Sequence, residues 1–130
     1  MKFLVLLAYF ITAVGSTCNR AKSNTSQKGS NCFKGRLEIK GICMNYVISV
    51  LEGDTTQLPL EKSWKDETDG KVYEKVFALG SPCTFPDLKE GETFYFTLAQ
   101  KEDTGCNVCM AYRPVPTLKN NIVVSKTPCP

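Results

Sequence analysis

Cys106 and Cys109 stand two residues apart, and this spacing is the one in the sequence that most directly suggests chemistry. A C-x-x-C pair can serve as a redox dithiol or as half of a zinc site. Redox use normally places the pair where a helix begins, whereas β-favouring residues (Val108, Met110 and Tyr112) surround it here. A zinc site would need a second pair of ligands, and the chain has no other C-x-x-C and no histidine. Both cysteines are therefore predicted to form structural disulfides.

The absence of histidine also removes Ser-His-Asp and Cys-His catalysis from consideration. Carboxylates remain as candidates for acid–base catalysis, but those in polar stretches have no apolar surroundings that would raise a carboxyl pKa. They are Glu61, Asp66, Glu67, Asp69, Glu90, Glu92, Glu102 and Asp103. The run from 61 to 71, in which lysines alternate with acids, is predicted to be a solvated loop. We therefore expect no enzyme activity, no cofactor and no metal ion of the chain's own.

The amino terminus has the layout of a secretory signal peptide. Lys2 precedes an apolar run from Phe3 to Val14, and small residues follow. The run is shorter than the roughly 20 apolar residues that span a bilayer. Residues 1–16 are therefore expected to be a signal, and residues 17–130 a single secreted domain without a membrane anchor.

Seven cysteines follow the expected signal, at positions 18, 32, 43, 83, 106, 109 and 129. In an oxidising compartment this density predicts a disulfide framework. Because seven is odd, one thiol is left over, and it could be free, capped, or bonded to a second chain in a covalent dimer. Asn24 begins the sequon Asn-Thr-Ser in a polar segment and is predicted to be a glycosylation site.

Short alternating patterns predict a small all-β protein. Strands are expected within 37–51 (with a bend at Gly41), 71–79, 92–99, 106–112 and 122–124, with turns at 52–54 and 86–91 and one helical turn at 117–121. On the second of these strands Tyr73, Phe77 and Leu79 should share a face. Five or six short strands at near-regular spacing favour an OB-fold-like barrel, held by disulfides and carrying one or two short helical turns.

The charge pattern argues against nucleic-acid binding. The formal net charge is only +3, and basic and acidic side chains are interspersed, so no basic stripe forms. Tyr73, Phe85 and Tyr95 could line an OB-type binding face, but cross-strand packing is the simpler expectation for them.

Three stretches in order resemble a known module. Cys18 near the expected mature start is followed by Cys32 just before the first strand. SPCTFPDLKEGETFYFTL (81–98) has a mid-chain cysteine, a turn and a long apolar strand, and NNIVVSKTPCP (120–130) closes with a cysteine and a proline. Together they resemble the netrin-type (NTR) module of tissue inhibitors of metalloproteinases, procollagen C-proteinase enhancers and the complement C345C domain. The resemblance implies an OB-fold-like, non-catalytic module that binds an extracellular protein, a protease or a receptor, as an inhibitor or modulator.

The resemblance also implies disulfide partners. By analogy with the family, Cys18 would pair with Cys83, and Cys32 with Cys129. The metalloproteinase inhibitors begin Cys-x-Cys, but Arg20 stands at the second of those positions here. The cysteine that would receive this bridge, Cys109 or Cys106, is then left to pair with Cys43, and the sequence does not separate the two choices.

In metalloproteinase inhibitors of this type, the α-amino group and carbonyl of a bridged first cysteine chelate the zinc of the protease. The resemblance implies this role for Cys18, with Asn19 beside the metal, and Arg20 follows in the same protein-binding segment. A residue ahead of Cys18 would turn the amine into an amide and abolish chelation, and the small-residue rule allows signal cleavage before Cys18 or one or two residues earlier. A zinc-chelating inhibitor, or a pheromone or immunomodulator read by a receptor, is therefore the alternative to a general protein-binding modulator.

Overall fold

A computed structural model describes residues 31–101, 103 and 105–130 of the chain. Its strands are β1 (Cys32–Lys40), β2 (Tyr46–Glu52), β3 (Glu61–Lys65), β4 (Val72–Leu79), β5 (Thr93–Leu98), β6 (Lys119–Asn120) and β7 (Ile122–Ser125). Two 3-10 turns, η1 (Ile42–Met44) and η2 (Thr55–Gln57), are the only helical elements of the described part. The protein is thus mostly β, as predicted, with seven strands where five or six were expected. Within the described ranges, neither turn approaches the length of a membrane-spanning helix.

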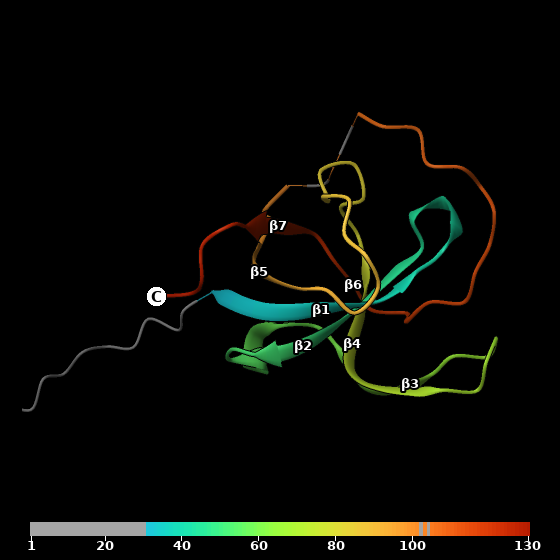
Figure 1. Cartoon of the computed structure of the whole chain (residues 1–130), viewed down its shortest axis with the longest axis horizontal. Helices are drawn as coiled ribbons and strands as arrows, with labels where there is room; N and C mark the ends of the chain where they lie inside the picture. Colours follow the sequence, from blue (N-terminus) through green and yellow to red (C-terminus); the bar gives the residue numbers. More distant parts are fainter. Residues whose placement is uncertain (1–30, 102, 104) are drawn as a thin grey trace, which may run out of the picture.

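The strands form one sheet in the order β3-β4-β2-β1-β5-β7, and every neighbouring pair in this order is antiparallel. β6 lies off this path and pairs in parallel with β4, placing Ala78 opposite Lys119. Only Asn121 separates β6 from β7. One short segment therefore pairs with β4 at its beginning and with β5 at its end, and in Figure 1 it is the dark red segment that runs between them.

The main core lies on one face of the curved sheet. It contains Phe33, Leu37, Ile48, Val50, Leu58, Phe77, Leu79, Phe94, Phe96 and Ile122. Phe96 is completely buried at its centre, and the ring centroids of Phe33, Phe77 and Phe94 lie 5.2–5.9 Å from its own. Stacked and tilted aromatic pairs at such distances stabilise a core beyond the area that they bury. β1 begins at Cys32, earlier than the alternation suggested, because Phe33 belongs to this core.

A second, smaller cluster lies on the opposite face of β2 and β4. It consists of Ile39, Val47, Tyr73 and Val76, with Trp64 and Val115 packed against it. The expectation that Tyr73 shares a face with Phe77 and Leu79 is wrong. Lys75 has a left-handed backbone (φ 52°), and this conformation shifts the alternation of β4 by one residue.

Three further expectations are corrected by the structure. Residues 106–112 form no strand, and 117–121 contains the short strand β6 in place of a helical turn. The stretch from 61 to 71 comprises β3 and a tight turn into β4, where a solvated loop was expected. β3 lies at the edge of the sheet, and an edge strand can be polar because part of it faces water.

Candidate functional site

The residues expected to act at the amino terminus, Cys18, Asn19 and Arg20, lie outside the described residues, as does the sequon at Asn24. Zinc chelation and glycosylation therefore stay predictions. The same holds for the position of signal cleavage and for any covalent dimer through Cys18.

Three disulfides join the six cysteines of the described part. Cys32 is bonded to Cys129, which is the pair that the resemblance implied. Cys43 is bonded to Cys109, one of the two choices that the sequence left open. Disulfides in this number are typical of an oxidising, extracellular-type environment.

The implied pair of Cys18 with Cys83 is wrong in this structure, because Cys83 is bonded to Cys106. Cys83 follows β4 closely, and the Cα atoms of Cys83 and Cys106 are 5.5 Å apart, which suits a disulfide. Both cysteines of the C-x-x-C pair are therefore bridged to other parts of the chain, as the structural interpretation of that motif predicted.

The segment around this motif exposes large apolar side chains. Met110 is 97% exposed and Tyr112 is 83% exposed, while Val108 beside them is also open to solvent. Ile42 and Met44 are exposed in η1, which the Cys43–Cys109 disulfide joins to this segment. Figure 1 shows the orange segment arching around the tip formed by β1 and β2. We call residues 42–44 and 108–112 the disulfide-linked apolar surface.

Several contacts hold this surface in place besides its disulfides. The side-chain amide of Asn45 donates to the carbonyl oxygens of Ile42 (2.8 Å) and Ala111 (3.0 Å), which links the two segments a second time. Immediately afterwards, Arg113 turns back to the sheet, where its Nη2 donates to Oδ2 of Asp66 at 2.9 Å. The surface is therefore anchored on both sides of its most exposed residues.

Asp66 was expected to be solvated and is instead completely buried. It starts the turn between β3 and β4, and its Oδ1 accepts a hydrogen bond from the Thr68 amide at 2.8 Å. Burial raises the pKa of the Asp66 carboxyl, but the hydrogen bonds from Thr68 and the guanidinium of Arg113 outweigh it. The pKa therefore lies below its ordinary value of 3.8. This shift is opposite to the one that a general acid at neutral pH requires, so Asp66 is an anchor for Arg113.

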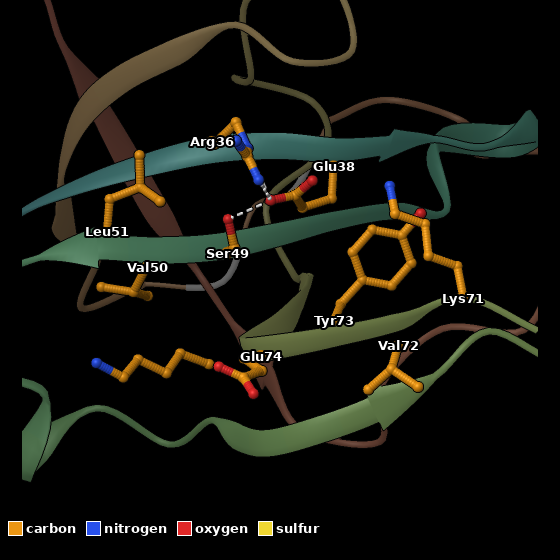
Figure 2. Close-up of a pocket in the computed structure, with 10 residues that line it drawn as sticks. Arg36, Glu38, Ser49, Val50, Leu51, Lys71, Val72, Tyr73 and Glu74 are labelled. Carbon is orange, nitrogen blue, oxygen red and sulfur yellow. Dashed lines mark hydrogen bonds and ion pairs between the residues drawn. The ribbon is translucent and has the colours of Figure 1, made fainter.

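A pocket of 330 Å³ opens on the outer face of β1, β2 and the beginning of β4 (Figure 2). Glu38 lies at its floor with a side chain only 8% exposed. One oxygen of Glu38, Oε1, accepts hydrogen bonds from Nε of Arg36 (2.8 Å) and from the hydroxyl of Ser49 (2.6 Å). The distance between the Ser49 hydroxyl and the Glu38 carboxylate is one that a nucleophile and its general base could have. However, Ser49 is buried and the Arg36 guanidinium binds the same oxygen, which favours a structural ion pair.

The described residues contain no group of three or more histidine, cysteine or acidic side chains that could hold a metal ion. No family model matches the chain, and neither a curated protein nor a solved structure is similar enough to suggest a relationship. The function must therefore be argued from the two surfaces just described.

Sequence reasoning missed both surfaces for different reasons. The apolar pattern of residues 108–112 predicts a strand, and their exposure depends on disulfide partners that the sequence alone leaves open. The pocket depends on the backbone of Lys75, for which the sequence offers no signal, because a left-handed conformation is expected mainly at glycine.

Proposed function

We propose that this protein is a secreted, non-catalytic module of the netrin type that binds an extracellular protein and inhibits or modulates it. The observation that carries the proposal is the disulfide-linked apolar surface. Single exposed apolar residues are ordinary on proteins. Here five of them (Ile42, Met44, Val108, Met110 and Tyr112) lie on two segments that a disulfide joins.

The composition of this surface suits a protein partner. Residues 105–112 contain no charged side chain, and the centres of protein interfaces are depleted of charge and enriched in tyrosine and methionine. Because residues 105–112 contain no lysine or arginine, they are not attracted to anionic lipid. Because two disulfides and the Asn45 hydrogen bonds fix the segment in advance, binding would cost little conformational entropy.

We also propose that the strands form a partly open barrel of the OB type. Two features support this arrangement: the continuous pairing from β4 through β2, β1 and β5 to β7, and the return of the chain to β4 through β6. The Cys32–Cys129 disulfide, which the family resemblance implied, is consistent with it. The disulfide-linked apolar surface would then lie in the loops that such barrels use for recognition.

The test uses a double variant that carries both Met110→Ser and Tyr112→Ser. Its control is Val123→Ser, which removes an exposed valine from β7, outside this surface. Labelled proteins are titrated against an array of purified extracellular proteins that includes zinc metalloproteinases and receptor ectodomains. We expect a saturable partner whose affinity falls about 100-fold with the double variant, because central aromatic and methionine contacts typically contribute 1–2 kcal/mol each. The control should bind like the wild type.

Equal affinities for the double variant and the wild type would show that the surface is not the contact. Equal losses for the double variant and the control would show a general stickiness of apolar residues. Circular dichroism and an unchanged unfolding midpoint confirm that each variant is folded.

A further inference from the structure

The pocket in Figure 2 lies where two neighbouring strands, β2 and β4, diverge. β2 and β4 are paired only from Val47 with Ala78 to Ser49 with Val76. β2 nevertheless continues to Glu52, and β4 already begins at Val72. Residues 50–52 and 72–74 are therefore extended strand segments that face each other across the gap without pairing.

The divergence begins at Lys75. Its φ of 52° lies in the left-handed region, which costs a non-glycine residue roughly 1–2 kcal/mol. Strain of this kind often marks places where a protein's function requires an irregular backbone. On the amino-terminal side of Lys75, β4 is paired with β3 alone, from Glu74 opposite Ser63 to Val72 opposite Lys65.

Each strand segment beside the gap uses only one of its two hydrogen-bonding edges. Residues 50–52 pair with β1 on their other side, where Gly35 lies opposite Val50 and Lys34 opposite Glu52. Residues 72–74 pair with β3 on theirs. Proteins usually cover or blunt such edges, because a free strand edge is a template for another extended chain. Here two edges converge on one gap whose volume of 330 Å³ is within the range of binding pockets, about 300–1,000 Å³.

The side chains around the gap indicate what kind of chain it would accept. Leu51 and Val72 are exposed at its rim and offer apolar contacts. Arg36 is already neutralised by Glu38, so it adds no free charge. Lys71 and Lys75 line the gap, and among residues 31–101, 103 and 105–130 neither forms an ion pair. Two amines without an acidic partner against the single carboxylate of Glu74 leave the site with an excess positive charge. Nζ of Lys71 lies 4.6 Å from the centroid of the Tyr73 ring, which also lines the gap.

We propose that the gap between β2 and β4 binds an extended peptide segment with alternating acidic and apolar side chains. Its main chain pairs with residues 50–52 or 72–74, as in strand addition to a sheet edge, and its carboxylates meet Lys71 and Lys75. This site uses other residues than the disulfide-linked apolar surface. It could exist whether or not that surface binds a partner.

The experiment uses nitrogen-15-labelled protein with intact disulfides and a synthetic probe, acetyl-Val-Glu-Val-Glu-Val-amide. We expect weak saturable binding, with a dissociation constant of about 0.1–1 mM, and amide shift changes centred on residues 50–52 and 72–74. The matched probe acetyl-Val-Lys-Val-Lys-Val-amide should bind about tenfold more weakly. A third probe has the glutamate sequence with an N-methyl group on every amide, and it should not bind because it has lost its main-chain donors on both edges.

Charge reversal supplies the matched variants. The double variant Lys71→Glu with Lys75→Glu changes two exposed side chains, so it should fold, and its preference should switch to the lysine probe. The control Lys126→Glu lies beyond β7 and should keep the preference of the wild type. The proposal is wrong if no probe binds, if the N-methylated probe binds as well as its parent, or if the shifts map elsewhere. A dimer in sedimentation equilibrium that the Lys71→Glu, Lys75→Glu double variant abolishes would also overturn it, because a second copy would then occupy the gap.

Discussion

Replacing Arg113 by alanine tests the most consequential contact that the sequence concealed. Asp66 is completely buried, and the guanidinium of Arg113 is the only partner of its Oδ2 among the described residues. Removing one member of a buried ion pair typically costs 3–5 kcal/mol, because the remaining charge is desolvated without compensation. The side chain of Arg113 is 22% exposed, so truncation would admit some water to Asp66. We therefore expect a loss at the lower end, about 3 kcal/mol.

Urea unfolding measures this loss. Trp64 is the only tryptophan of the chain and packs against Tyr73 at 6.0 Å in the second cluster, beside the turn that holds Asp66. Its fluorescence therefore reports on this region. With a urea dependence of about 1–3 kcal/mol per molar, the midpoint of the Arg113→Ala variant should fall by about 1–3 M. The fitted slope should stay unchanged.

Asp66→Asn is the matched variant. The new amide oxygen can still accept the Thr68 hydrogen bond, and the partly exposed guanidinium of Arg113 can turn to water. Its loss should be smaller, about 1–2 kcal/mol. The double variant should lose about 1–2 kcal/mol less than the two single losses together, because both remove the same interaction. A midpoint for Arg113→Ala within about 0.3 M of the wild type would refute this account and show Asp66 to be solvated, as its charged neighbours suggested.

Three further predictions address pH, the disulfides and packing. Because the folded-state pKa of Asp66 lies below 3.8, its contribution to stability is present above that pH and is lost as the pH falls through the folded-state value. Lowering the pH from about 5 to 2 should therefore reduce the free energy of unfolding of the wild type more than that of Asp66→Asn. Equal losses for the two proteins would contradict this. Replacing Cys43 and Cys109 by alanine should cost about 4 kcal/mol on the chain-entropy account for a separation of 66 residues; thermal unfolding measures this, and a loss below about 1 kcal/mol would exclude the bridge. Gly41→Ala should lower stability by about 1–3 kcal/mol in urea titrations, because its new methyl group would clash with the backbone carbonyl oxygen of Asn45 and would also lie 2.7 Å from Cδ of Arg113. A neutral result would mean that the backbone around Asn45 moves away freely.

Local alternation predicted the parts of the fold in which each strand buries one face. β5 is the clearest case: Phe94 and Phe96 are buried in the main core, and Leu98 packs against it, as their spacing indicated. The interruption at Gly41 also appears, where β1 ends and η1 begins. In these places the signal and its cause lie within a few neighbouring residues, so a single sequence suffices.

The burial of Asp66 could not be predicted in this way. Its partner Arg113 lies 47 residues later in the chain, and nothing in the alternating charges from 61 to 71 distinguishes Asp66 from its neighbours. The same limit applies to the bond between Cys83 and Cys106, because partner choice depends on the path of a segment without regular structure. The gap beside β4 depends on one left-handed backbone at a lysine, where alternation predicts a continuous strand.

The distribution of the disulfides suggests why the apolar surface can remain exposed. Residues 105–118 form no helix or strand, and an irregular segment of this length would ordinarily need its own buried side chains to stay in place. Here Pro116 is buried and Val115 packs against the second cluster. Cys106 and Cys109 bond the rest of the segment to Cys83 after β4 and to Cys43 in η1, and Arg113 holds it through Asp66. The position of the segment therefore does not depend on burying Met110 or Tyr112. Side chains released from a structural role in this way are available to contact a partner.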